Sequence, residues 1–136
     1  MGINVTFVIK KLIILTDLFL PKDLLLHFTI IDIQSLCEIK LKREIFHIYL
    51  EEKNELPKGY TKEHYESKGF YKEKIIQDFP IRGKAVYLVI KRRRWRKKAT
   101  KKEIKSDYSF IAVGSKLTEE LADFLKGTGV DTSRYH

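Results

Sequence analysis

The residues from Lys91 to Lys105 are the part of this sequence whose side chains could do the most chemistry. Within these fifteen residues there are ten Lys or Arg and a single acid, Glu103, so the segment carries a net charge of +9. The whole chain of 136 residues also has a net charge of +9. A charge that is concentrated in this way attracts a polyanion, whereas charge that serves solubility alone is spread over the surface.

The two kinds of cation in this segment have different uses. The planar guanidinium group of Arg can pair with a phosphate or with the edge of a guanine, whereas Lys acts as a flexible point charge on phosphates. Trp95 could stack on an unpaired base, insert between base pairs, or anchor the segment to the domain. A solvated charged face remains the alternative for the run as a whole. The residues predicted to bind DNA are Arg82, Lys84, Lys91, Arg92, Arg93, Arg94, Trp95, Arg96, Lys97, Lys98, Lys101, Lys102 and Lys105.

No arrangement of residues in the sequence indicates catalysis or a metal. Cys37 is the one cysteine, so neither an internal disulfide nor a four-cysteine zinc site can form. The histidines are scattered at His27, His47, His64 and His136. Asp78, Asp107 and Asp123 match no motif for an acidic metal cluster, and the isolated glycines form no phosphate-binding loop. We therefore predict a protein with no catalytic residues, no metal and no cofactor.

The strand pattern predicts how the basic run is held. Val86, Leu88 and Ile90 alternate along a predicted strand from Ala85 to Arg96, but from Lys91 onward both faces become charged. Because an unpaired buried charge costs several kcal/mol, this strand should leave the core and continue as a solvated arm. Pro80 to Lys84 predicts a turn, in which Gly83 takes a positive φ.

The remaining pattern predicts an α+β fold, a small antiparallel β-meander with a short N-terminal helix and a C-terminal helix. The expected elements are a helix over Leu18–Phe28, strands over Thr29–Ile39, Glu44–Glu51, Phe70–Phe79, Ala85–Arg96 and Ser106–Val113, a loop over Glu52–Lys68, and a helix over Thr118–Lys126 that Thr118 caps. We expect a loosely ordered extension at 1–15, a single domain at 16–127 and a flexible tail at 128–136.

The apolar N-terminal stretch does not predict membrane insertion. Lys10 and Lys11 split it, and Asp17 interrupts it again, so it lacks the order of charge and apolar residues found in a signal peptide. It is also too short and too charged to span a bilayer. We expect a cytoplasmic, nucleoid-associated protein with no membrane contact, in which residues 1–15 could reflect an upstream start of translation.

The segment from Ser67 to Trp95 resembles the N-terminal region of insertion-sequence transposases of the ISAon type, within the wider ISL group. The resemblance rests on Ser-Lys-Gly-Phe-Tyr, on Ile-Gln-Asp-Phe-Pro-Ile-Arg-Gly-Lys-Ala-Val-Tyr-Leu and on Lys-Arg-Arg-Arg-Trp. The positions that match the hairpin of that group are Asp78, Phe79, Pro80, Gly83, Val86 and Leu88, and those that match its basic end are Arg93 and Arg94. The whole resemblance covers Phe28 to Lys126, where Leu117 to Lys126 is similar to a helix leading to a helix-turn-helix.

The resemblance implies a zinc-ribbon-like fold that binds the terminal repeats of a mobile element in duplex DNA. It also implies a catalytic part elsewhere, as a separate transposase chain that acts as a partner or as a continuation lost to a frame change, because the sequence ends before any helix-turn-helix or catalytic core. The cysteines of the group would fall near Tyr60 and after Trp95, where this chain has none, so the fold is expected to form without zinc.

Besides binding to the ends of a mobile element, two other interpretations are compatible with the same residues. A homo-oligomer is compatible with all three. A general RNA-binding or ribosome-associated protein would have the same small size, exposed basic arm and pI near 9.6. A truncated remnant that folds without a task is the third. Competition between the element's end DNA and a structured RNA would separate the first two functions.

Overall fold

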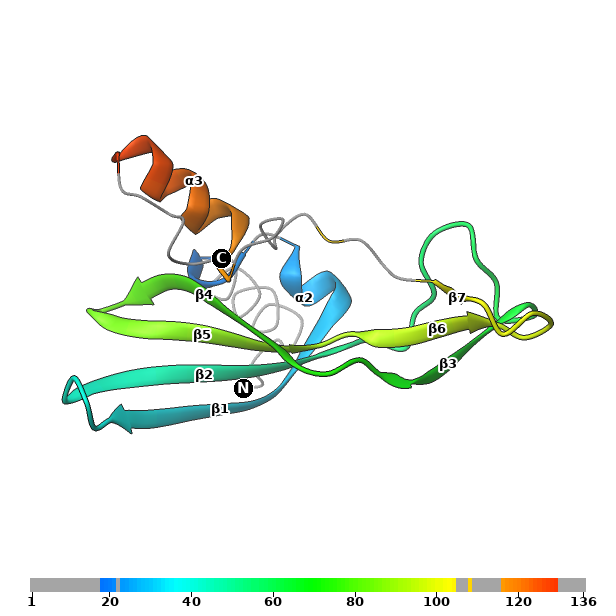
Figure 1. Ribbon diagram of the computed structural model, residues 1–136, viewed down its shortest axis with the longest axis horizontal. Helices are drawn as coiled ribbons and strands as arrows, with labels where there is room; N and C mark the ends of the chain where they lie inside the picture. Colours follow the sequence, from blue (N-terminus) through cyan, green and yellow to red (C-terminus); the bar gives the residue numbers. More distant parts are fainter. Residues whose placement is uncertain (1–17, 22, 105–107, 109–115, 130–136) are drawn as a thin grey trace, which may run out of the picture.

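The computed structural model describes residues 18–21, 23–104, 108 and 116–129, and it has the predicted α+β fold. Two sheets rich in antiparallel pairs form most of the structure, with a short helix toward each end of the chain (Figure 1). The predicted N-terminal extension, almost all of the predicted strand Ser106–Val113 and most of the predicted tail lie outside the described residues. None of the described helices is long and apolar enough to cross a membrane.

The first sheet has four strands, in the order β1-β2-β5-β4. They are β1 (Phe28–Glu38), β2 (Arg43–Glu52), β5 (Lys84–Lys91) and β4 (Lys74–Ile81). β1 and β2 pair antiparallel, as do β4 and β5, whereas β2 and β5 pair parallel at the centre of the sheet. This parallel pair departs from the expected antiparallel meander, because the strand pattern alone gives no information on which strands become neighbours.

The core lies against one face of this sheet and follows from the alternation of residues along its strands. Val86, Leu88 and Ile90 of β5 are fully buried, as predicted, and they pack with Ile48 and Leu50 of β2. The helix α2 (Leu24–His27) contributes Leu24 to the same cluster. It is shorter than the predicted helix over Leu18–Phe28, because Asp23 adopts a left-handed conformation with φ 64° and interrupts the helical turn.

A two-residue turn joins β4 to β5. Ile81 pairs with Lys84, and both residues between them have positive φ, 51° at Arg82 and 75° at Gly83. Positive φ at both positions is typical of the type I′ turn, whose twist matches that of the flanking strands. The positive φ predicted for Gly83 is confirmed.

The C-terminal helix α3 (Glu119–Gly127) is capped by Thr118 as predicted and is joined to β4. The Thr118 hydroxyl accepts a hydrogen bond from the Leu121 amide at 3.4 Å and donates one to the Asp78 carboxylate at 2.9 Å. The backbone of Gln77 in β4 bonds to the chain on either side of Leu117. Burial raises the pKa of Asp78 above its ordinary value, since an ionised carboxylate is poorly solvated there.

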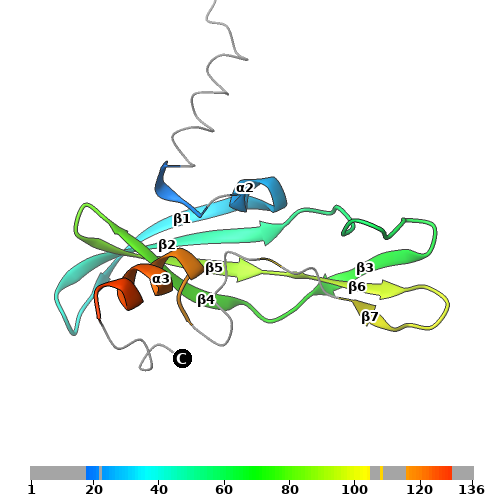
Figure 2. The ribbon, with the colours of Figure 1, turned by 90° about the horizontal axis from the view of Figure 1, so that it is seen from above.

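The second sheet forms an arm that extends beyond the first (Figures 1 and 2). It consists of β3 (Tyr65–Phe70), β6 (Arg93–Lys97) and β7 (Glu103–Ile104), in the order β3-β6-β7. The predicted strand Ala85–Arg96 is therefore divided at Arg92 into β5 and β6, and the predicted strand Phe70–Phe79 is divided into β3 and β4. The predicted loop Glu52–Lys68 is too long by five residues, because β2 runs to Glu52 and β3 begins at Tyr65. The chain leaves the core after Ile90, as the loss of alternation predicts.

Candidate nucleic-acid interface

The arm is joined to the four-stranded sheet through one buried acid, Glu52, at the end of β2. Its carboxylate accepts hydrogen bonds from the Arg93 backbone amide at 3.2 Å and from the Trp95 indole Nε1 at 3.3 Å. Its backbone carbonyl accepts a third bond, from Arg93 Nε at 2.9 Å. Glu52 and Trp95 are each 2% exposed. Of the three roles considered for Trp95, anchoring the arm is therefore the one that the structure shows.

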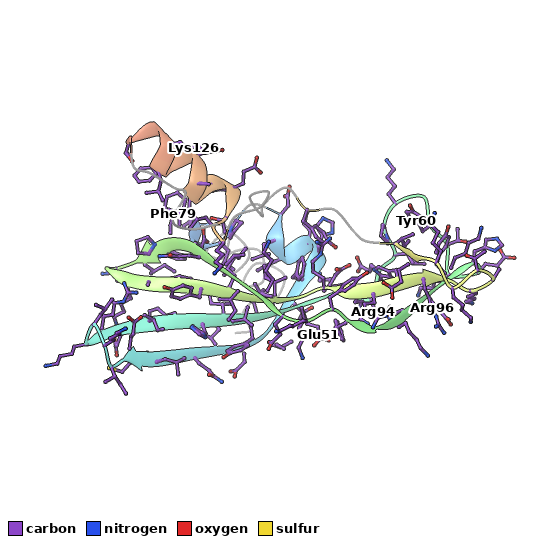
Figure 3. The ribbon with its side chains drawn as sticks, in the orientation of Figure 1. Glu51, Tyr60, Phe79, Arg94, Arg96 and Lys126 are labelled. Atoms are coloured by element: carbon purple, nitrogen blue, oxygen red, sulfur yellow. The ribbon has the colours of Figure 1, made fainter. Side chains whose placement is uncertain are left out.

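The arginines of β6 have partners within the protein. Arg93 also donates to the Ser67 hydroxyl at 3.2 Å, and its guanidinium lies 4.7 Å from the centre of the Phe70 ring. Arg94 pairs with Glu103 of β7, and Arg96 Nε lies 2.6 Å from a carboxylate oxygen of Glu66 in β3. These arginines join β6 to the strands on its two sides. Figure 3 shows Arg94 and Arg96 on the arm, far from Phe79 and Lys126 at the opposite end of the molecule.

The charges of the arm change the titration of the groups that they contact. The hydrogen bond from Arg96 lowers the pKa of Glu66, and the positive charges of Arg96, Lys101 and Lys68 act in the same direction. Burial raises the pKa of the Tyr71 hydroxyl, and the nearby negative charge of Glu103 raises it further. The lowered pKa of Glu66 favours its ionised form, in which the carboxylate pairs with Arg96.

Lys91 and Arg92 lie at the joint between the two sheets and are half-buried. The Lys91 ammonium lies 6.0 Å from the centre of the Phe70 ring, and the Arg92 guanidinium lies 5.3 Å from that of Tyr108. The Nε of Arg92 is buried and has no hydrogen-bond partner among the described residues. Both side chains thus rest on aromatic rings rather than projecting fully into solvent.

The turn between β6 and β7 differs from the strand before it. We call Lys97–Lys102 the lysine turn, because four of its residues are lysines: Lys97, Lys98, Lys101 and Lys102. All four are exposed, and no acidic side chain in the described part of the chain forms an ion pair with any of them. The turn is nevertheless well held: the amide of Lys97 donates to Lys102 and that of Lys101 to Lys97, each at 2.8 Å.

A neighbouring loop fixes the lysine turn in place. The amide of Lys98 donates to the carbonyl of His64 at 2.8 Å, just before β3. Tyr60 in the same loop packs edge-to-face on Tyr65, with ring centres 4.8 Å apart. The four lysines are thus held by backbone hydrogen bonds on a turn at the far end of the arm, a geometry that can place several cations on one polyanion.

The predicted DNA-binding residues do not all come together. Arg82 and Lys84 lie in and beside the β4–β5 turn, at the other end of the long strand pair, and Lys84 forms an ion pair with Glu44 at 2.6 Å. At about 3.3 Å per residue, Lys84 is roughly 40 Å from Lys97 along the strands. Lys105 lies outside the described residues.

The pairing of the arginines with acidic side chains was not predicted. Glu52, Glu66 and Glu103 lie 41, 30 and 9 residues from the arginines that they bond. Only Glu103 could have been found, because it lies inside the basic run. Among the described residues, no group of three or more His, Cys, Asp or Glu side chains is arranged to hold a metal ion.

Comparisons of the chain with models of protein families, with curated proteins and with solved structures find no match. The resemblance to the transposase N-terminal region, the mobile-element DNA and the catalytic partner chain therefore stay predictions.

Proposed function

We propose that this protein binds nucleic acid through the lysine turn, with the arm as a rigid support. The observation that supports the proposal is the contrast within the basic run. The arginines of β6 are paired inside the arm, whereas the four lysines are exposed without ion-pair partners in the described structure. Neutralising phosphates is the interaction for which exposed, clustered lysines are suited, because each phosphate contact releases a condensed counterion.

The finer form of the proposal follows the sequence resemblance. We propose duplex DNA as the ligand, the terminal repeats of a mobile element as its biological form, and a catalytic transposase chain as the partner that cuts and joins. Arginine reading of guanine, one of the two uses that the sequence leaves open for Arg, requires Arg93 or Arg94 to exchange its partners in the arm for a base. We therefore propose that the lysine turn supplies the affinity for DNA and that any sequence preference is a separate, additional contribution of the arginines.

A salt titration of duplex binding tests the proposal. If the four lysines each neutralise one phosphate, they contribute about −3.6 to the slope of log affinity against log salt. Replacing Lys97, Lys98, Lys101 and Lys102 with Ala should remove that contribution and weaken all duplex sequences about equally. The measurement is fluorescence anisotropy of a labelled duplex at several salt concentrations, with the element's end sequence, a scrambled sequence and a structured RNA as competitors.

A matched variant separates the lysine turn from net charge. Lys40, Lys42, Arg82 and Lys126 are exposed and lie on turns or the helix at the sheet end of the molecule. Replacing these four with Ala removes the same number of charges and should leave the slope nearly unchanged.

If both variants lost affinity equally, binding would depend on net charge alone. If the lysine-turn variant kept the wild-type affinity and slope, the proposed interface would be wrong. A stronger competition by RNA than by either duplex would favour the RNA-binding alternative.

A further inference from the structure

The face of the four-stranded sheet opposite the core carries a row of aromatic side chains that takes no part in the proposed interface at the lysine turn. Tyr87 in β5 pairs in register with His47 in β2, and Tyr49 lies two residues further along β2. The rings of Tyr87 and His47 have centres 5.6 Å apart, and those of His47 and Tyr49 lie 6.2 Å apart. The row thus crosses the two central strands of the sheet.

These rings are accessible. All three side chains are half-buried, and none of them belongs to either hydrophobic cluster of the described structure. They point away from the core because Val86, Leu88 and Ile90 occupy the other face of β5. Tyr49 is also held in position, since its hydroxyl donates to the Gln34 side chain at 3.3 Å.

An open cleft of about 700 Å³ lies at the β4 side of this row. It is lined by Tyr87, Ile75 and Gln77 together with three lysines and one acid: Lys72, Lys74, Lys116 and Glu73. The three lysines are exposed, and none of them forms an ion pair with a described acid. An aromatic ring bordered by several cations suits a ligand that has a flat base and an anionic backbone.

We propose that this face binds unpaired nucleotides of a nucleic-acid strand, with a base stacked on Tyr87 and the adjoining phosphates on Lys72, Lys74 and Lys116. The choice of ligand class rests on the proposed function, but the residues do not overlap with the lysine turn. Tyr87 is ten residues from Lys97, which is roughly 33 Å along an extended strand. The two surfaces can therefore be altered independently. A duplex cannot stack on this face, because its bases are already paired and stacked.

The first test compares single-stranded and duplex binding of two variants at Tyr87. Tyr87→Leu should lower the affinity for a labelled oligothymidylate by about tenfold, as the loss of one base-stacking ring does, and leave duplex affinity unchanged. Tyr87→Phe keeps the ring and should bind the oligonucleotide as the wild type does. If Tyr87→Leu bound the oligonucleotide with wild-type affinity, or if it lost duplex affinity equally, the proposed site would be wrong.

A second measurement uses the wild-type chain and does not depend on how the variants fold. An oligonucleotide that contains 5-iodouracil is cross-linked by ultraviolet light, and the modified peptide is identified by mass spectrometry. Cross-links at Tyr87, His47 or Tyr49 are expected, and cross-links confined to the arm would overturn the proposal. The variant without the four lysines of the lysine turn distinguishes the two proposals. Loss of duplex binding with retained cross-linking at Tyr87 would support both of them. Unchanged duplex binding would contradict the proposal for the lysine turn and leave the one for Tyr87 standing.

Discussion

Strand β6 and the lysine turn are adjacent in sequence and both rich in positive charge, yet they differ in what their charges contact. Arg93, Arg94 and Arg96 are paired with groups on β2, β3 and β7. The lysines that follow are exposed on a backbone turn. The arginines hold the arm together, and the lysines remain available for a ligand.

The difference follows from the chemistry of the two side chains. A guanidinium group presents several donors in a fixed plane, so one Arg can bond a backbone carbonyl, a hydroxyl and an aromatic face together, as Arg93 does. A lysine ammonium is compact and strongly hydrated, and it loses more by being held in one geometry. A basic run is therefore not a uniform surface, and its arginines can be structural even where its lysines are not.

Removing the acid that joins the arm to the sheet should have the largest effect. Glu52→Ala leaves the Trp95 indole and the Arg93 amide buried without their acceptor, so we expect a loss of about 3 kcal/mol in the free energy of unfolding. Trp95 is the only tryptophan, so its fluorescence reports on the arm and should shift to longer wavelength. The measurement is urea denaturation followed by this fluorescence.

Glu55→Ala is the control for this change. Glu55 is exposed three residues further along the chain, so its loss should change stability by no more than about 0.5 kcal/mol. If Glu52→Ala were as stable as Glu55→Ala and kept the wild-type emission, Trp95 would not anchor the arm through Glu52.

Replacing Arg with Lys should distinguish the contribution of Arg93 to stability from that of Arg94. Arg93→Lys keeps the charge but cannot bond both the Glu52 carbonyl and the Ser67 hydroxyl, so we expect a loss of about 1–2 kcal/mol. Arg94→Lys can still pair with Glu103 at the exposed edge, where both side chains are 42% exposed, and its denaturation midpoint should not move measurably. Equal effects of the two changes would mean that the bonds of Arg93 add nothing to those of an exposed ion pair.

The sequence predicted the parts of this structure that depend on local pattern. The alternation of Val86, Leu88 and Ile90, its end at Lys91, the positive φ of Gly83 and the Thr118 cap are all local, and the structure confirms them. The parallel pairing of β2 with β5 is not local, because the residues that pair are 40 apart, such as His47 and Tyr87. Neighbouring strands of this kind are chosen by tertiary packing.

The candidate site was predictable only as a concentration of charge. The sequence placed the arm after Ile90, but it treated Arg92 to Lys102 as equally available, because the acids that pair with Arg93 and Arg96 lie in β2 and β3. Arg82 was included with the others although the turn that holds it lies at the far end of the hairpin. The aromatic row of Tyr87, His47 and Tyr49 was missed because its members come from two strands that are distant in sequence.

The smallest effect is expected from a change in the backbone of the lysine turn. Lys101 has a φ of 59°, a left-handed conformation that costs a residue with a side chain about 1–2 kcal/mol. Lys101→Gly relieves this strain, but glycine loses about 0.5–1 kcal/mol in backbone entropy, so we expect a net gain of about 0.5 kcal/mol in stability. Lys102→Gly is the matched control, because Lys102 is not among the residues with positive φ, and it should lose about 0.5–1 kcal/mol.

Each variant removes one lysine of the four, so each should reduce the salt slope of duplex binding by about 0.9. Urea denaturation and the anisotropy titration measure the two quantities on the same proteins. A lower stability for Lys101→Gly than for the wild type would show that the lysine turn does not hold this strained conformation. If the two variants change stability in opposite directions but reduce the salt slope equally, the backbone conformation of the turn affects stability alone and its charge affects binding.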